Sequence, residues 1–268
     1  MAIDGVTCLM QEKYCLFHIQ EFTEEMKTIL RDNLAYICHG EEPVSSGSRI
    51  YSYKNTIKEF LKRYNGKTPE VQEGLIGELL THLLVRHYFE QYEVVTPFFN
   101  MEERSIKKGY DVILTEKEDA KIWIVEVKSG QLHKDKDSNQ TMQDLLNTAK
   151  NDLKKRLNEG NLSLWQEAIN GARLAYNSNR NLKGAVIDLL MRYGEETVDD
   201  HSTSGNKNVL LSGVLFAELS DKVIEDTPKD KQSGIEKEGI FGNTYIVSLQ
   251  KHTYELIYNF LRDEINEK

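Results

Sequence analysis

Apolar residues recur along the chain with two different periods, which predict a protein that mixes helices and strands. Helical spacing is clearest over residues 68–89, where Thr68 suits the N-cap and Pro69 suits the first helical position. Two apolar runs rich in β-branched residues, 110–115 and 121–128, instead predict neighbouring strands. The same patterns predict further helices at 23–36, 53–64, 141–158, 162–176 and 252–266, and further strands at 15–20, 93–99, 209–218 and 244–249.

Three segments carry weaker patterns. Residues 182–193 form an apolar run that would serve as a strand or as a helix. Residues 41–48 and 226–239 have the composition of loops, and the second is expected to be a mobile loop or an insertion. The order of helix, three strands and helix, followed by more strands and a final helix, predicts an α/β fold. We expect a single domain over residues 1–268, with a central mixed sheet flanked by helices and with helical additions at the N-terminus.

The composition suits a globular protein with a sizeable core. Of the 268 residues, 39% are hydrophobic and 29% are charged. No apolar run approaches the ~18 residues of a membrane span, so we expect no membrane association. The first residues lack a basic segment followed by an apolar one, which argues against a secretory signal. Three cysteines without metal-type spacing are typical of reduced thiols in a cytosol, so the expected location is cytoplasmic.

The charge of the chain is unevenly distributed. A net charge of −9 argues against a protein that coats nucleic acid by bulk charge alone, but not against an enzyme in which only the groove is positive. Basic residues gather on both sides of the second strand, at 104–108, 134–136 and 150–156. Lys107 and Lys108 are therefore candidate contacts to nucleic acid, although ordinary solvated faces explain such clusters as well.

The second strand ends in a pair of charges that is costly to bury unless both are used. Residues two apart in a strand share a face, so Glu126 and Lys128 point the same way. The tripeptide Asp/Glu-x-Lys occurs four times in the chain, but only Glu126-Val127-Lys128 lies at the end of an apolar strand. Only here does another strand, carrying Asp111, lie upstream at the distance of a short hairpin. The alternative is an exposed end of a sheet with a coincidental ion pair.

Phosphodiester hydrolysis is the chemistry that this residue set fits. Two carboxylates that converge from neighbouring strands can hold Mg²⁺, which prefers oxygen ligands and keeps several waters. Asp111, Glu126 and the main-chain carbonyl of Val127 are the candidate ligands for Mg²⁺, and Mn²⁺ can take its place. Lys128 is a candidate to orient or deprotonate the attacking water, or to stabilise the negative transition state. Partial burial near a divalent cation predicts a lowered pKa for this lysine.

Glu78 and two glutamines are weaker candidates. Glu78 borders the apolar stripe of its helix and could reach a metal at the edge of the sheet. The alternative is a glutamate whose side-chain stem packs on the core while its carboxylate stays in water. Gln140 and Gln143 lie early in the next helix, where they could touch phosphate or base, or simply begin the helix. His82 and His87 are five apart without a suitably spaced third ligand, which argues against zinc.

The combined motif resembles a known nuclease superfamily. Glu78, the segment Gly109-Tyr110-Asp111, the segment Glu126-Val127-Lys128 and an early glutamine in the next helix are similar to the PD-(D/E)xK nucleases, over residues 68–160. Tyr110 stands where that pattern has proline. The Gly-Leu-Ile-Gly-Glu helix, the Ile-Val-Glu-Val-Lys-Ser strand and the chain length resemble more specifically the HamA family, the effector subunits of the Hachiman antiphage defence system.

This resemblance implies a restriction-endonuclease-like sheet and a nonspecific, metal-dependent DNA endonuclease. Asp111, Glu126 and Lys128 would be the catalytic set, with Glu78 in support. The implied partner is a superfamily 2 helicase, HamB, which would restrain the nuclease and sense aberrant DNA, so that activation leads to abortive infection. Two alternatives stay open: a non-catalytic subunit that docks a helicase or clamps DNA, and a nuclease that acts on RNA.

Overall fold

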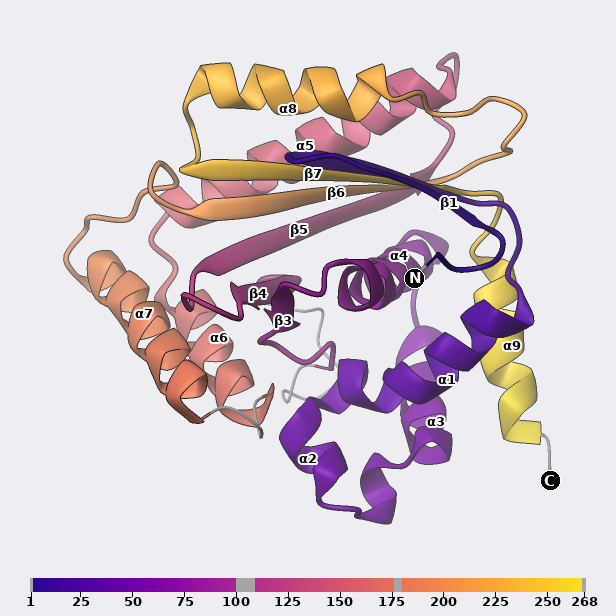
Figure 1. Cartoon of the computed structure of the whole chain (residues 1–268), viewed down its shortest axis with the longest axis horizontal. Coiled ribbons are helices and arrows are strands. Elements are labelled where there is room, and N and C mark those ends of the chain that lie inside the picture. The colour runs from indigo at the N-terminus through magenta and orange to yellow at the C-terminus, as the bar shows by residue number, and fades with distance from the viewer. Residues whose placement is uncertain (1, 100–108, 176–179, 267–268) are drawn as a thin grey trace.

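The computed structural model describes residues 2–99, 109–175 and 180–266, and it is built around one mixed sheet (Figure 1). In spatial order the strands are β1 (Val6–Met10), β2 (Tyr14–Ile19), β7 (Asn243–Lys251), β6 (Asn208–Phe216), β5 (Ile122–Gln131), β4 (Val112–Glu116) and β3 (Tyr92–Val94). The central strands β2, β7, β6 and β5 run parallel to one another. β1, β4 and β3 pair antiparallel at the two edges. Strands from both ends of the chain therefore meet in one sheet.

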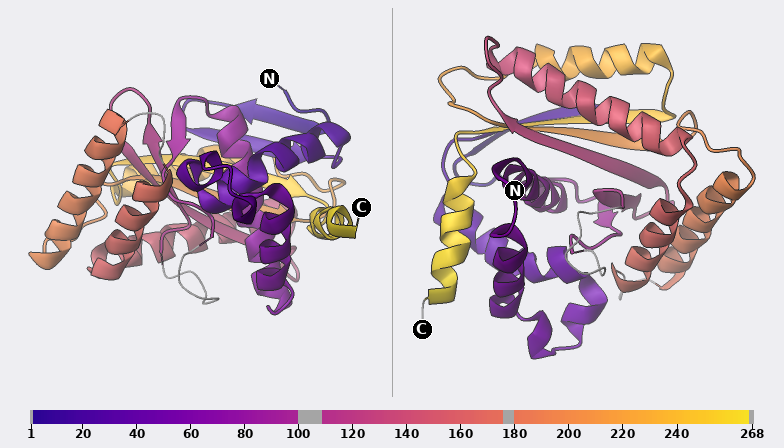
Figure 2. Two further views of the ribbon diagram at one scale, coloured as in Figure 1. Left: turned by 90° about the horizontal axis from the view of Figure 1, so that it is seen from below. Right: turned by 180° about the vertical axis from the view of Figure 1, so that it is seen from behind.

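Helices cover both faces of the sheet (Figures 1 and 2). On one face lies α4 (Pro69–Tyr88), with α1 (Glu24–His39), α3 (Tyr53–Tyr64) and α9 (Glu255–Asn266) around it; α2 (Glu41–Ser45) and a 3₁₀ turn (Arg49–Tyr51) connect α1 to α3. On the other face lie α5 (Ser138–Asn158) and α8 (Asp226–Glu238), and α6 (Leu162–Ala175) packs with α7 (Arg180–Val198) as a pair beside them. In the part of the chain that the structure describes, no helix combines the length and the apolar character needed to cross a membrane.

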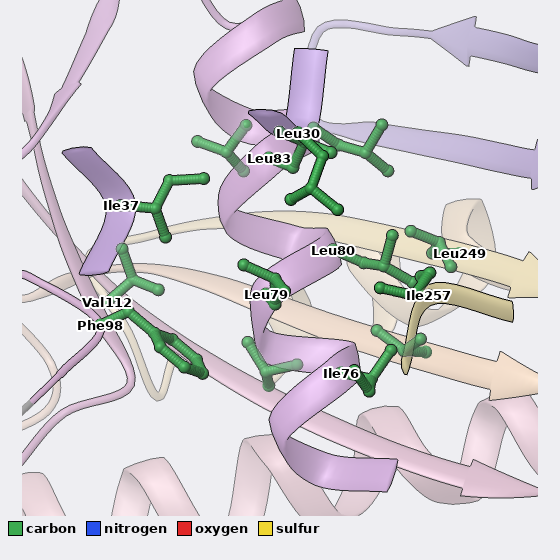
Figure 3. Close-up of a cluster of buried hydrophobic side chains, with 14 of the residues drawn as sticks. Leu30, Ile37, Ile76, Leu79, Leu80, Leu83, Phe98, Val112, Leu249 and Ile257 are labelled. Atoms are coloured by element: carbon green, nitrogen blue, oxygen red, sulfur yellow. The ribbon is translucent and has the colours of Figure 1, made fainter. Parts of the chain in front are cut away.

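The helix α4 is apolar on most sides because two layers enclose it. The apolar side chains that it buries most completely are those of Ile76, Leu79, Leu80, Leu83 and Leu84. Figure 3 shows α4 leucines and isoleucines between side chains of the sheet and side chains of α1 and α9. Gly77 lets the helix approach β5 closely, since a Cβ at this position would overlap the hydroxyl of Ser129. The next residue, Glu78, is thereby held close to the strand that carries Glu126.

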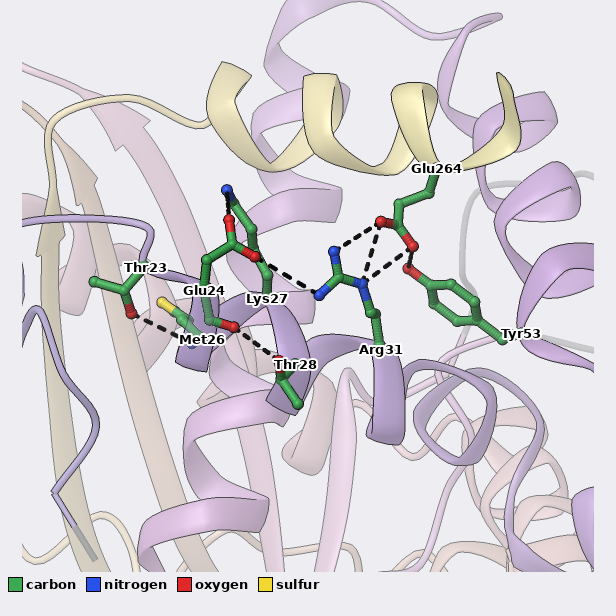
Figure 4. A network of polar contacts seen from close by, with 8 residues as sticks. All are labelled: Thr23, Glu24, Met26, Lys27, Thr28, Arg31, Tyr53 and Glu264. Carbon is green, nitrogen blue, oxygen red and sulfur yellow. Dashed lines mark hydrogen bonds and ion pairs between the residues drawn. The ribbon is translucent and has the colours of Figure 1, made fainter. Parts of the chain in front are cut away.

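A polar network ties the C-terminal helix to the N-terminal helices (Figure 4). Arg31 of α1 donates to both carboxylate oxygens of Glu264 in α9, at 2.9–3.2 Å, and Tyr53 of α3 donates to the same carboxylate at 3.0 Å. Thr23 caps α1 by accepting a hydrogen bond from the N–H of Met26 at 3.3 Å. These contacts fix the layer against which α4 packs.

The predicted architecture, a central mixed sheet flanked by helices, is confirmed. The run 182–193, for which strand and helix are both open, is helical within α7 because one apolar side packs on α6. The expectation of a mobile loop at 226–239 is wrong: this polar segment forms α8, which buries a narrow side around Ile235 against β2 and β7. β1 is absent from the predicted strands; it pairs with β2, which overlaps the predicted strand 15–20, so a β-hairpin precedes the first helix.

Candidate active site

The register between β4 and β5 brings Asp111 opposite Glu126. Val112 pairs with Val125 in the antiparallel ladder, so the two residues immediately beyond this pair also lie opposite each other. Because β4 begins at Val112, the β5 residues after Val125 have a neighbouring strand only on the β6 side. The main-chain N–H of Val127 donates instead to Oδ2 of Asp111, at 2.8 Å. The carboxylate of Asp111 thus accepts the main-chain hydrogen bond that a longer β4 would accept from β5.

Glu126 is fully buried, and its two carboxylate oxygens have different surroundings. Oε1 accepts a hydrogen bond from the ammonium of Lys128 at 3.0 Å and a closer one from the guanidinium of Arg156. Oε2 is buried and has no hydrogen-bond partner among the described residues. Lys128 also contacts Oδ2 of Asp152 at 2.7 Å. Four charged side chains therefore link β5 to α5, while one carboxylate oxygen stays without a hydrogen bond.

Burial and neighbouring charges shift the pKa values of the Glu-x-Lys pair. Burial, followed by the negative charge of Asp111, raises the pKa of Glu126 to about 8 against the opposing effect of Arg156 and Lys128. Burial acts to lower the pKa of Lys128, but the carboxylates of Glu126 and Asp152 outweigh it and the pKa is raised. The lowered pKa that the sequence predicts for Lys128 refers to a lysine beside a divalent cation and stays a prediction; the two carboxylates around the lysine act in the opposite direction.

One cavity of about 660 Å³ collects the residues of the predicted catalytic set. The strand pair contributes Asp111, Glu126, Val127 and Lys128 to its lining, and α4 contributes the half-buried Glu78. The rest of the lining includes aromatic and basic side chains, among them Phe60, Phe98, Phe99, Arg63 and Lys67. The cavity thus combines acidic groups with basic and apolar walls, which suits a ligand that is both anionic and partly apolar.

The oxygen atoms of the strand pair suit a hard divalent cation. Oε2 of Glu126 is a buried acceptor without a hydrogen bond, and Asp111 lies opposite. The Val127 carbonyl points to the same edge as its N–H, since both groups of one strand residue face the same neighbour. Over residues 2–99, 109–175 and 180–266, no three His, Cys, Asp or Glu side chains lie close enough to hold a metal ion. The fit is therefore to two carboxylates, one carbonyl and water, as Mg²⁺ accepts.

The remaining candidate residues lie elsewhere. Gln140 closes the capping box of α5 by exchanging hydrogen bonds with the N-cap residue. Gln143 donates to the main-chain oxygen of Thr227 at 2.9 Å, and neither glutamine is among the described residues that line the cavity. Lys107 and Lys108 lie outside the described residues. Contact of these four residues with nucleic acid stays a prediction.

Two residues of α5 belong to the site although the sequence pattern does not indicate them. Asp152 and Arg156 are one helical turn apart and border the buried stripe of the helix. A charged pair at this spacing is also typical of a solvated helix face, so its signal in the sequence is slight. Packing of α5 against the sheet is what turns these side chains toward Glu126 and Lys128.

Comparison with known proteins gives one clear match. A search among proteins of curated function finds none that matches the chain. A family model with the description HamA matches residues 8–265, which is nearly the whole chain and includes all the described residues that line the cavity. The match spans the sheet and both helix layers, so it applies to the complete fold and not to the Glu-x-Lys segment alone. The chain therefore belongs to the HamA family, components of the Hachiman antiphage defence system.

Proposed function

We propose that this chain is a metal-dependent DNA endonuclease and the effector of its antiphage system. The proposal rests on one observation: two buried carboxylates, Asp111 and Glu126, line one cavity together with Lys128, whose ammonium contacts Glu126. A buried carboxylate oxygen without a hydrogen bond is unfavourable in a folded protein. A divalent cation at Oε2 of Glu126 would remove this penalty, which supports a metal site at this position.

The contacts of each residue support a particular role. Asp111, Glu126 and the Val127 carbonyl would hold Mg²⁺ or Mn²⁺, which when bound supplies charge neutralisation at the phosphate and activation of water. Lys128 keeps its positive charge between two carboxylates and is placed to stabilise negative charge on phosphate oxygens. Glu78 lines the same cavity, where it can orient a water molecule. Burial of the carboxylates limits the access of bulk water to these groups.

The proposal includes a helicase partner. HamA-family membership places the chain in the Hachiman system, and the implied partner is the superfamily 2 helicase HamB. The sequence has a Gly-Lys-Thr step at 66–68, but Leu61 stands where a phosphate-binding loop has its first glycine, so the chain lacks the motif that binds ATP phosphates. We propose that the helicase, as the ATP-consuming subunit, restrains cleavage until it meets aberrant DNA. Cleavage is then without sequence preference, which suits an effector that ends infection by destroying DNA.

Cleavage of supercoiled plasmid tests the enzyme and its site together. The purified chain is incubated with Mg²⁺, Mn²⁺ or EDTA, with RNA in parallel, first alone and then with the helicase and ATP. Glu126→Gln keeps the shape of the side chain and removes its charge, and Lys128→Ala removes the ammonium. Lys121→Ala is the matched control, because it removes an exposed lysine just before the same strand.

We expect metal-dependent cleavage that both site variants lose, by a factor of at least about 100, and that the control retains. Cleavage that persists in EDTA, or in a folded Glu126→Gln variant, would contradict the proposal. If no condition yields cleavage and cells with Glu126→Gln still resist phage, the chain is instead a non-catalytic subunit that docks the helicase or clamps DNA. Cleavage of RNA but not of DNA would show that the chain is a nuclease that acts on RNA.

A further inference from the structure

We infer that Arg156 is a positioning residue of the active site, which sets the separation of the two carboxylates and leaves one oxygen of Glu126 for the metal. This inference rests on the proposed nuclease function and extends it to the helix α5. Arg156 is half-buried and reaches from α5 both to β5 and to the segment just before β4. It donates from Nη1 to the main-chain oxygen of Gly109, at 3.3 Å, and from Nη2 to Oε1 of Glu126.

The bridge made by Arg156 lies where the sheet itself gives no support. The last ladder pair between β4 and β5 is Val112 with Val125, so the chain before Val112 is not held by strand pairing. Gly109 lies two residues before Asp111 in this unpaired stretch. By holding Gly109 and Glu126 at once, the guanidinium fixes the approach of Asp111 to Glu126. The hydrogen bond from the main-chain N–H of Val127 to Asp111 also crosses this gap.

The contacts also decide which oxygen of Glu126 a cation can use. Arg156 and Lys128 both bind Oε1, whereas Oε2 has no hydrogen-bond partner among the described residues. An arginine that competed with the metal would occupy the oxygen that faces the cation. Here the arginine and a cation can bind different oxygens of the same carboxylate at the same time. Arg156 therefore leaves Oε2 open to a cation while it holds the carboxylate in place.

An arginine is suited to this bridge in a way that a lysine is not. The planar guanidinium presents several N–H groups in a fixed fork, so it can reach two acceptors on different segments of the chain. A lysine at the same position keeps the positive charge but offers a single ammonium at the end of a flexible stem. Arg156→Lys thus separates the charge of the residue from its geometry, and Arg156→Gln removes both.

The test is the affinity for Mn²⁺, measured on the full chain by electron paramagnetic resonance or calorimetry. The variants are Arg156→Gln, Arg156→Lys and the control Lys155→Gln, which removes a neighbouring, exposed charge of α5 whose ion pair is with Glu159. We expect Arg156→Gln to bind Mn²⁺ about 10–100-fold more weakly, as replacements that disturb the groups orienting a metal ligand do. Arg156→Lys should fall between this variant and the wild type, and Lys155→Gln should bind as the wild type does.

Two further measurements keep the outcome clear. Circular dichroism and metal-free thermal unfolding show whether each variant is folded, and if Arg156→Gln is not, Arg156→Lys carries the test. Unchanged or tighter Mn²⁺ binding by a folded Arg156→Gln, with normal binding by the wild type, overturns the inference and leaves the proposed function intact. Wild-type protein that binds no Mn²⁺ overturns the proposed function, and this inference with it.

Discussion

Replacement of Lys251 by methionine should stabilise the protein at neutral pH. Lys251 is the last residue of β7 and is only 2% exposed. It shares a face of the sheet with Leu249, and its register partners are the buried Ile19 and Phe216. Within the described part of the chain, its ammonium has no ion pair or hydrogen bond. Burial without a compensating partner lowers the pKa of Lys251 from 10.5 to about 8.

The magnitude of the effect follows from this change in pKa. At about 1.4 kcal/mol for each pKa unit, the difference between 10.5 and about 8 corresponds to about 3 kcal/mol of destabilisation by the charged form. The unfolded chain keeps its proton up to about pH 10.5, whereas the folded chain keeps it only up to about pH 8. Between these values the unfolded state binds more protons, so stability rises with pH. The penalty is therefore complete below pH 8 and absent above about pH 10.5.

Urea unfolding of the wild type and Lys251→Met, at pH 7 and at pH 10.5, measures this difference. Methionine is unbranched and flexible, so it fills the volume of the lysine stem without a charge. We expect Lys251→Met to be more stable by up to about 3 kcal/mol at pH 7, with most of the gain gone at pH 10.5. The exposed Lys237 on α8 provides the control, Lys237→Met, which should change stability by less than about 0.5 kcal/mol. No gain at pH 7, or an equal gain at both pH values, would refute the reasoning.

Three further changes test how the fold supports the site. Gly77→Ala should destabilise the protein by about 1–3 kcal/mol, because the added Cβ would overlap Ser129. Gly74→Ala in the same helix adds a Cβ to open space and should be neutral or stabilising, and thermal unfolding compares the two variants. Leu79→Ala should cost about 2–5 kcal/mol in urea unfolding because the side chain is fully enclosed, and a cost below 1 kcal/mol would mean that α4 is loosely packed. Thr23→Ala should cost about 1 kcal/mol through loss of the α1 cap, while Thr23→Ser should retain it.

The strand pair of the site could be predicted from the sequence because its determinants are local. Two short apolar runs joined by a polar turn specify a hairpin, and the hairpin places Asp111 opposite Glu126. The segment 226–239 could not be predicted, since its burial is confined to a narrow side and its composition is that of a loop. Arg156 was beyond prediction for another reason: it meets Glu126 across 30 residues of sequence, through packing that no local pattern encodes.

The pKa of Lys128 depends on contacts that cannot be predicted from the sequence around it. The sequence correctly indicates that the lysine is partly buried, and burial alone would lower its pKa. In the structure, Glu126 and Asp152 oppose this effect of burial, and Asp152 is contributed by α5, outside the strand that carries the Glu-x-Lys pair. These contacts support the part of the proposed function in which Lys128 acts as a positive charge rather than as a base.

The position of the site follows from the length of β4 as much as from the identity of its residues. Buried main-chain groups need hydrogen-bond partners, and after Val125 β5 has no strand beside it on the β4 side. Asp111 supplies a partner for Val127 and, because it is a side chain rather than a strand, leaves space for a ligand beside Glu126. If β4 began two residues earlier, its main chain would pair with Val127 and would free Asp111 from this contact. The end of a strand therefore creates both the demand for polar side chains and the cavity into which they point.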